Sequence, residues 1–165
     1  MVRKTLTLVV VSLLLASLGL AQSKSADKKA SAAPTNAPDK ALMQKILDAW
    51  STMDTNVVGQ YYDKASSDVF YDVAPVKYDS WAQYVEGVQK LFGTLQSIKF
   101  ATNDDATVHH AGNFAWGTST VKTVMTDKSG KVTNLDCRWT VVWEKKGPHW
   151  LVVHDHFSAP MEAAK

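Results

Sequence analysis

The chain has 165 residues, of which 45% are hydrophobic and 21% are charged, a composition typical of one globular domain with a core of its own. Its 18 basic residues exceed its 16 acidic residues by two, and removing Arg3 and Lys4 with the N-terminal segment leaves 16 of each, so the mature chain is formally neutral. A neutral chain without a clustered basic run argues against nucleic-acid binding, and the single cysteine, Cys137, cannot form an internal disulfide.

Residues 1–21 have the pattern of a secretory signal peptide. Arg3 and Lys4 precede an uncharged apolar run over residues 6–20, and the small residues Gly19 and Ala21 suit cleavage after Ala21. A retained membrane anchor is the alternative, but this run of about 15 residues is shorter than the roughly 20 that cross a bilayer. The sequence therefore predicts a secreted or periplasmic protein that has no membrane attachment after cleavage.

Residues 22–39 are mostly Ala, Ser, Lys and Pro, which bury too little apolar surface to offset their ordering entropy, so they are predicted to be a disordered linker. The domain is predicted over residues 40–160, with a short tail at 161–165.

Three helices are predicted in the first half of the domain. Apolar residues at helical spacing predict one over residues 41–53, with Asp39 as its cap, and a shorter one over residues 56–62. After a short strand at residues 69–73, a capping box that begins at Ser80 starts the third helix, whose apolar stripe continues to residue 95.

The remainder of the domain is predicted to be strands. They cover residues 98–101, 106–111 and 114–126, followed by a long hairpin formed by residues 135–144 and 150–158. Helices that precede a meander indicate an α+β fold in which the helices cover one face of a bent antiparallel sheet. Such a helix layer facing a curved sheet encloses a cone.

Side-chain alternation in the hairpin predicts which of its side chains face the interior of this cone. In its first strand, Trp139 and its alternate neighbours form the buried face. In its second strand, apolar content favours the face of Leu151, Val153, Asp155 and Phe157, which leaves Asp155 as an isolated inward carboxylate. The alternative is a one-residue bulge in this strand, which would turn Asp155 outward.

The order of elements, together with the residues Trp139-Thr140-Val141-Val142-Trp143, Gly147, and Trp150 through Ser158, resembles the SnoaL-like branch of the nuclear transport factor 2-like (ketosteroid isomerase-like) superfamily. The resemblance covers about residues 40–160. It implies a cone-shaped fold of three N-terminal helices packed on a strongly curved antiparallel sheet. It does not specify function, because this superfamily contains enzymes, binding proteins and scaffolds.

Alignment with ketosteroid isomerase implies a catalytic role for Asp72. Asp72 falls where that enzyme has its general base, whereas the two oxyanion donors fall near Ile46 and Trp139. Steroid isomerisation by that mechanism is therefore not expected, because donors of this kind supply several kcal/mol of the barrier lowering. Another proton-transfer or water-addition chemistry stays open.

The candidate catalytic residues are Asp72 and Asp155, and the alternative for Asp72 is an exposed carboxylate at a turn. Aromatic side chains supply the candidate ligand-binding wall, although aromatic residues at these spacings are more often core. They are Tyr62, Trp81, Tyr84, Trp116, Trp139 and Phe157.

His154 and His156 share one side of a strand, a spacing that can hold a metal, but no third ligand is evident and no metal or other cofactor is predicted. With Arg138 they form a candidate polar cluster or homodimer interface. The sequence thus predicts an exported protein that binds a small, mostly apolar ligand in the cone, with acid/base chemistry of the isomerase, cyclase or lyase type. The alternative is a non-catalytic dimerisation or ligand-carrier module of the same fold.

Overall fold

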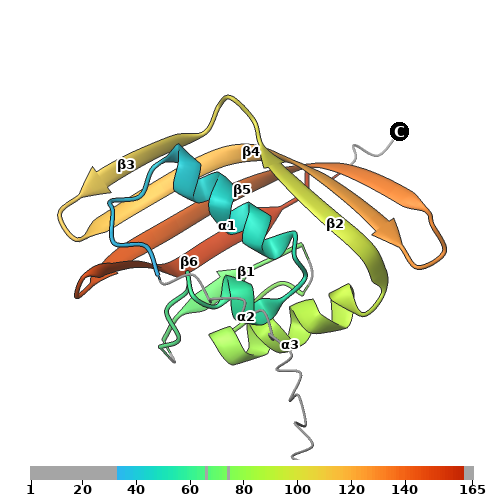
Figure 1. Ribbon diagram of the computed structural model, residues 1–165, viewed down its shortest axis with the longest axis horizontal. Helices are drawn as coiled ribbons and strands as arrows, with labels where there is room; N and C mark the ends of the chain where they lie inside the picture. The colour runs from blue at the N-terminus through green and yellow to red at the C-terminus, as the bar shows by residue number, and fades with distance from the viewer. Residues whose placement is uncertain (1–32, 66, 74, 162–165) are drawn as a thin grey trace, which may run out of the picture.

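The computed structural model describes residues 33–65, 67–73 and 75–161. The predicted signal peptide, most of the predicted linker and the end of the tail lie outside the described residues. The described chain begins with two helices, a strand and a third helix, and five consecutive strands follow. The six strands form one mixed sheet (Figure 1). The elements are α1 (Lys40–Trp50), α2 (Thr55–Val58), β1 (Val69–Tyr71), α3 (Trp81–Phe92), β2 (Leu95–Thr102), β3 (Thr107–Ala111), β4 (Phe114–Asp127), β5 (Val132–Lys146) and β6 (His149–Ser158).

Helices α1 and α3 begin where capping chemistry predicts them. The carboxylate of Asp39 accepts a hydrogen bond from the Leu42 N–H at 2.7 Å, and the Ser80 hydroxyl accepts one from the Gln83 N–H at 3.3 Å. Each helix buries one apolar stripe against the rest of the domain. The third helix is shorter than the predicted stripe, because it ends at Phe92 and Leu95 already belongs to β2.

The second helix is also shorter than predicted. It ends at Val58, and after a turn the chain reaches β6, where Tyr62 forms a bridge with Val152. The Val152 N–H donates to the Tyr61 carbonyl at 2.8 Å, and the Asp63 N–H donates to the Val152 carbonyl at 2.9 Å. These backbone bonds replace the helical ones that the pattern over residues 56–62 predicted, and they bury Tyr62 in the interior.

The sheet has the strand order β1-β6-β5-β4-β2, with β3 also paired to β4. The pairs among β2 to β6 are antiparallel, but β1 is parallel to β6, so the prediction of a wholly antiparallel sheet is wrong. In this parallel pair Phe70 lies opposite Asp155. The short strand at residues 69–73 is therefore placed at the far end of the sheet from the strand that follows α3.

A bulge in β6 decides which of its side chains face the core. Val142 pairs with His154, and Trp143 pairs with Val152, so Val153 is the extra residue. Trp150 and Val152 are buried before the bulge and Asp155 is buried after it. The predicted inward face of Leu151 and Val153 is wrong, and the bulge directs Asp155 inward rather than outward.

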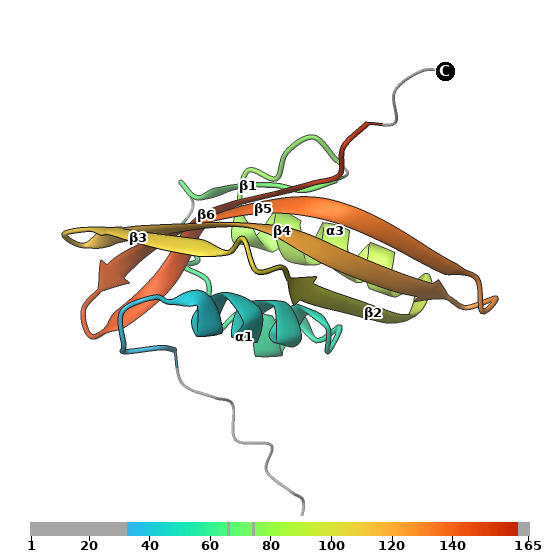
Figure 2. The same cartoon turned by 90° about the horizontal axis from the view of Figure 1, so that it is seen from above.

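Helix α1 lies across one face of the curved sheet (Figures 1 and 2). In the view of Figure 1, α3 lies below α1, near β1 and the start of β2. Gly117 of β4 permits the close approach of α1, because a Cβ atom there would lie 2.8 Å from the Met43 sulfur. Met43, Trp143 and their neighbours form a core in which both side chains are fully buried. Among the described residues no helix is long and apolar enough to cross a bilayer.

The last residues of the predicted linker lie against the domain. The Trp150 N–H donates to the Pro34 carbonyl at 2.9 Å, and the His149 Nδ1 lies 3.1 Å from the Ala33 carbonyl oxygen. Pro38 is fully buried. The packed part of the chain thus begins before the predicted boundary at residue 40.

Candidate functional site

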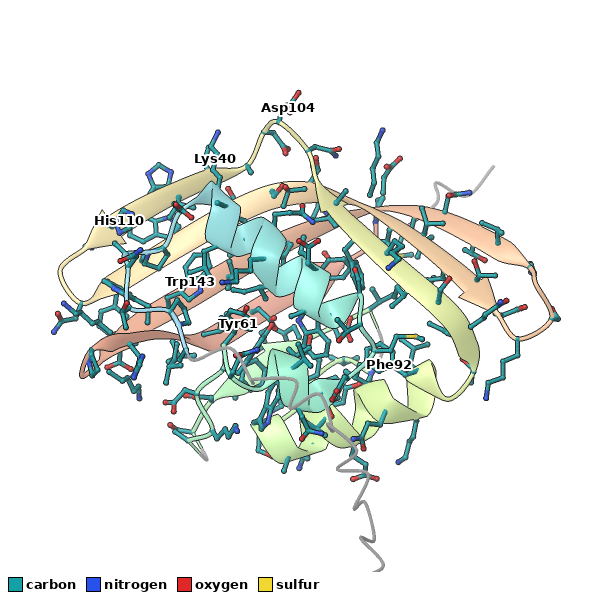
Figure 3. All side chains as sticks on the ribbon, in the orientation of Figure 1. Lys40, Tyr61, Phe92, Asp104, His110 and Trp143 are labelled. Atoms are coloured by element: carbon teal, nitrogen blue, oxygen red, sulfur yellow. The ribbon has the colours of Figure 1, made fainter. Side chains whose placement is uncertain are left out.

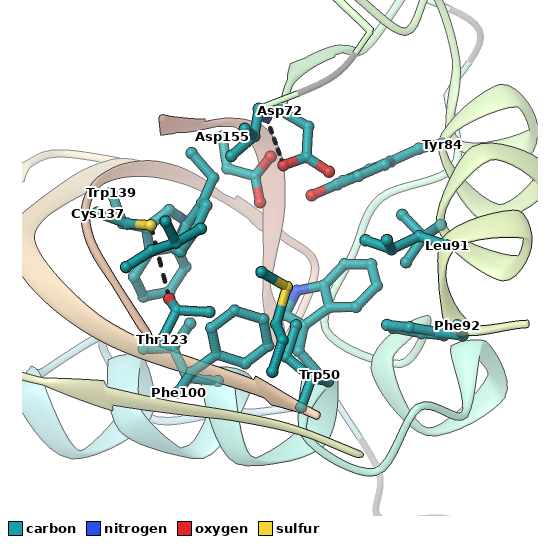
Figure 4. A pocket seen from close by; sticks show the side chains of 17 residues that line it. Trp50, Asp72, Tyr84, Leu91, Phe92, Phe100, Thr123, Cys137, Trp139 and Asp155 are labelled. Carbon is teal, nitrogen blue, oxygen red and sulfur yellow. Dashed lines mark hydrogen bonds between the residues drawn. The ribbon is translucent and has the colours of Figure 1, made fainter. Parts of the chain in front are cut away.

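A cavity of about 240 Å³ lies between the helices and the concave side of the sheet (Figure 4). Its polar side chains are few, and Asp72, Asp155 and Tyr84 come together at one end of it. Thr123 and Cys137 face it from the sheet, where the Thr123 hydroxyl lies 3.6 Å from the Cys137 sulfur. The rest of the wall is apolar, and it includes Leu47, Trp50, Val88, Leu91, Phe92, Ile98, Phe100, Met125, Leu135, Trp139 and Phe157.

Asp155 is a buried carboxyl group at the cavity wall, with 1% of its surface exposed. The Tyr62 hydroxyl donates to its Oδ2 at 2.6 Å, while its Oδ1 has no hydrogen-bond partner among the described residues. The pKa of Asp155 is raised to about 7, chiefly by burial and also by the negative charge of Asp72, although polar interactions with Tyr62 and Trp139 lower it. The protonated form of Asp155 is therefore well populated near neutral pH.

Asp72 follows β1, two positions after the buried Phe70, so strand alternation turns its side chain to the cavity. One of its oxygens accepts a hydrogen bond from the Val73 N–H at 2.7 Å. The pKa of this carboxyl is raised to about 6, because burial outweighs the lowering effect of the Val73 N–H. The negative charge of Asp72, once that group is ionised, opposes ionisation of Asp155.

An aromatic cluster behind the two carboxyl groups excludes water from them. The Tyr84 ring stacks on Phe70 at 5.2 Å between ring centroids and on Tyr78 at 5.0 Å, and its hydroxyl points toward Asp72 (Figure 4). The Tyr62 ring stacks on Trp81 at 4.7 Å. This packing is the physical source of the desolvation that raises both carboxyl pKa values.

Three of the six predicted ligand-binding aromatic residues line the cavity, namely Tyr84, Trp139 and Phe157. Tyr62 and Trp81 do not line it, because they pack behind Asp155 as part of the aromatic cluster. Trp116 faces the outer side of β4, where 40% of its surface is exposed and its ring stacks on His109 at 5.3 Å. Its inward neighbours are Ala115 and Gly117, so strand parity alone excludes it from the cavity.

Several cavity residues were not among the predicted site residues. Trp50 and Leu47 belong to the buried stripe of α1, and Cys137 shares strand parity with Trp139, so both signals were present in the sequence. Thr123 and Met125 share strand parity with the buried Val121 of β4, which is the same kind of signal. Phe100 belongs to β2, whose burial pattern does not alternate, so it carried no comparable signal.

The predicted polar cluster lies on the outer face of the sheet and away from the cavity. His154 Nδ1 lies 2.7 Å from the Val69 carbonyl oxygen, and the Tyr71 ring contacts both His154 and His156, at 5.4 and 5.6 Å. Arg138 is separate from them and donates a long hydrogen bond of 3.5 Å to the Ala159 carbonyl. No group of three or more His, Cys, Asp or Glu side chains within the described part of the chain could hold a metal ion.

A curved sheet closed by helices around an apolar chamber defines a cone-shaped α+β protein of the nuclear transport factor 2-like class. The chain belongs to the SnoaL-like domain family, whose model matches residues 40–162.

Solved structures agree with this class. A nuclear transport factor 2-like superfamily protein from Salmonella enterica is 17% identical, with a TM-score of 0.66 over 75% of this chain and 92% of that one. A candidate calcium/calmodulin-dependent protein kinase II association domain from Xanthomonas campestris is 24% identical, with a TM-score of 0.65 over 81% of this chain and 95% of that one. A candidate dehydratase of the NTF2-like family from Streptomyces avermitilis is 17% identical, with a TM-score of 0.61 over 76% of this chain and 100% of that one. At these identities the likeness shows the fold alone. Among curated proteins, none matches the chain.

Proposed function

We propose that this protein is exported, binds a small, mostly apolar ligand in the cavity, and acts on it by acid/base chemistry of the isomerase, cyclase or lyase type. One observation carries the proposal: two carboxyl groups with pKa values near neutral, Asp72 and Asp155, face one end of an otherwise apolar cavity. A structural ion pair does not account for them, since no Lys, Arg or His lines this cavity among the described residues.

The difference between the two carboxyl groups supports their division into a base and an acid. Near neutral pH the favoured state has Asp72 ionised and Asp155 protonated. The Val73 N–H stabilises the Asp72 carboxylate, whereas burial and the charge of Asp72 favour the neutral form of Asp155. A group whose pKa lies near the working pH is the most effective proton carrier. An apolar wall then binds the ligand skeleton, and the carboxyl pair reacts with its polar end.

The cavity volume supports a small ligand. About 240 Å³ lies somewhat below the roughly 300–1,000 Å³ of pockets for drug-sized molecules, so we expect a molecule of one or two rings or of comparable size.

The test is exchange of deuterium from heavy water into carbon positions beside a carbonyl group. A panel of small cyclic and aryl ketones, followed by NMR, should exchange faster with the protein than in buffer. Asp72→Asn should slow this exchange by roughly 100-fold or more. The control is Asp104→Asn, which changes an exposed carboxylate on the opposite side of the molecule from Phe92 at the cavity (Figure 3). Catalysis is refuted if ketones bind in the cavity but exchange at the buffer rate.

The export part of the proposal is tested separately. Expression of the full chain in a bacterial host should yield a periplasmic or secreted protein whose N-terminal residue is Gln22, as measured by mass spectrometry of the intact protein. A full-length protein retained in the cytoplasm would contradict it.

A second candidate function is homodimerisation through the outer face of the sheet. Trp116, Val142 and His154 follow one another in register across β4, β5 and β6, and Tyr71 and Phe114 are also exposed on this face. An exposed aromatic patch that crosses several strands favours a self-complementary contact with a second copy.

Sedimentation of the mature protein at high micromolar concentration tests this candidate. We expect a dimer that Trp116→Lys converts to a monomer, whereas Val132→Lys, an exposed apolar residue near the β4–β5 turn, should leave it intact. A monomeric wild-type protein would rule out the interface.

A further inference from the structure

The cavity wall carries a second polar point, separate from the carboxyl end, on the concave face of the sheet. Thr123 of β4 is 3% exposed, and its hydroxyl donates to the Cys137 sulfur of β5 at 3.6 Å (Figure 4). Thr123 lies opposite Leu135, so Cys137 is its diagonal neighbour on the same face. Both side chains line the cavity, and together they form the Thr123–Cys137 pair.

The Thr123 hydroxyl is poorly satisfied by this contact. A thiol sulfur is a weak acceptor, and within the described part of the chain it is the only hydrogen-bond partner of this hydroxyl. By contrast, the buried hydroxyl of Thr55 accepts a hydrogen bond from the Gln89 side-chain amide at 3.1 Å. The Thr123 hydroxyl can therefore gain a stronger hydrogen bond from an oxygen atom placed in the cavity.

The neighbours of Thr123 on this wall are apolar. Phe100 of β2 and Leu135 of β5 lie opposite it. On its own strand, Val121 and Met125 flank it on the same side. A valine side chain has nearly the same shape and would fill this space without the desolvation cost of a weakly bonded hydroxyl. Packing alone thus does not require a hydroxyl here, whereas a polar atom of a ligand would use it.

The Thr123–Cys137 pair is uncharged. Burial raises the pKa of the Cys137 thiol, and the negative charges of Asp72 and Asp136 raise it as well, although the Thr123 hydroxyl lowers it. The thiol is therefore neutral and a poor nucleophile. Among the described residues no Lys, Arg or His side chain lines this cavity. The pair consequently suits a neutral hydroxyl or carbonyl group rather than an ion.

The pair lies at a different level of the sheet from the carboxyl end. Asp155 pairs with Val141, which is four positions beyond Cys137 on β5. Four residues of strand span roughly 13 Å, and side chains on a concave face converge, so the polar atoms are closer together than this. A molecule of two fused rings can reach from one polar point to the other.

We infer that Thr123 is a specificity-determining residue and that the Thr123–Cys137 pair is a subsite for an oxygen atom of the ligand. The inference rests on the proposed function and narrows its ligand class to a two-ring apolar molecule with a neutral hydroxyl or carbonyl group remote from its reacting end. When this ligand binds, the Thr123 hydroxyl hydrogen turns from the sulfur to the ligand oxygen, which exchanges a weak acceptor for a strong one.

A matched pair of ketones tests the subsite, namely 6-hydroxy-2-acetylnaphthalene and its 6-methyl analogue, because a hydroxyl and a methyl group are similar in size. Calorimetric titration of the whole mature protein gives the ratio of the two affinities, hydroxyl probe over methyl probe. Thr123→Val should lower this ratio roughly three- to tenfold, the effect of one hydrogen bond. The matched control Thr55→Val removes a buried hydroxyl that does not line the cavity and should leave the ratio unchanged. An unchanged ratio in Thr123→Val overturns the inference.

Urea unfolding of the ligand-free protein tests the same residue without a probe. Thr123→Val removes a hydroxyl whose partner is a sulfur, so the urea midpoint should stay the same or rise. Thr55→Val should lower the midpoint, because the Gln89 amide loses its acceptor. A lowered midpoint in Thr123→Val would mean that the hydroxyl serves the fold, and it overturns the inference. If neither ketone binds the wild-type protein, the proposed function fails, and the midpoint of Thr123→Val alone then decides the role of Thr123.

Discussion

Replacement of Asp155 by Asn is the most informative perturbation of stability. Burial raises the folded-state pKa of this carboxyl from the ordinary 3.8 to about 7. Between these two values the folded state keeps a proton that the unfolded chain has released, so the wild-type protein loses stability as the pH rises through this range. At 1.36 kcal/mol per pH unit the full loss is about 4 kcal/mol, of which about 3 kcal/mol falls between pH 5 and pH 8.

The Asn side chain resembles the protonated carboxyl and does not titrate. Its amide oxygen can accept the Tyr62 hydroxyl hydrogen bond, so that hydroxyl keeps its acceptor. We therefore expect the free energy of unfolding of Asp155→Asn, relative to wild type, to increase by about 3 kcal/mol from pH 5 to pH 8. All other ionisable groups are common to both proteins, so the difference isolates this carboxyl.

The assay is urea unfolding followed by tryptophan fluorescence at pH 5, 6, 7 and 8. Asp104→Asn, which changes an exposed carboxylate at the β2–β3 turn, serves as the control and should follow the wild-type pH dependence. A difference between Asp155→Asn and wild type that is constant with pH, or that decreases as the pH rises, would refute the assignment of Asp155 as a buried carboxyl with a raised pKa.

Three further predictions concern the scaffold and the cavity mouth. Gly117→Ala should lower the free energy of unfolding by about 1–3 kcal/mol, because its Cβ would overlap the Met43 sulfur, and urea unfolding measures this loss. Asp39→Ala removes the cap of α1 and should cost about 1 kcal/mol in the same experiment, whereas a cost near zero would mean that the 2.7 Å bond to Leu42 contributes nothing. Leu91→Arg places a charge at the rim of the cavity and should abolish binding of the small aryl ketones with little change in unfolding free energy, since Leu91 is 42% exposed.

Much of the fold was predictable because its signals are local. The Asp39 and Ser80 caps mark the starts of α1 and α3, and the apolar stripes that follow identify their buried faces. The long strands β4 and β5 alternate cleanly between core and surface, so the inward position of Cys137 and Trp139 also followed from the sequence.

The candidate site was predictable only in part. Strand alternation indicated Asp155 as a candidate site residue, and the family resemblance indicated Asp72. Neither signal shows that the two side chains line the same cavity. The same reasoning included Trp116, because an aromatic residue in a strand looks alike in sequence whichever face it occupies. It also placed Tyr62 at the ligand, whereas the structure places it behind Asp155 as a hydrogen-bond donor.

The sequence by itself determined the α+β class, the capped helices and the alternating strands, because capping and side-chain periodicity act between residues close in the chain. Only the tertiary structure decided that β1 pairs in parallel with β6 and that Val153 bulges. Those two features bring Asp72 and Asp155, 83 positions apart in the sequence, to one end of the cavity. Strand partners and registers at such separations depend on how the whole core packs, and no local pattern encodes that packing.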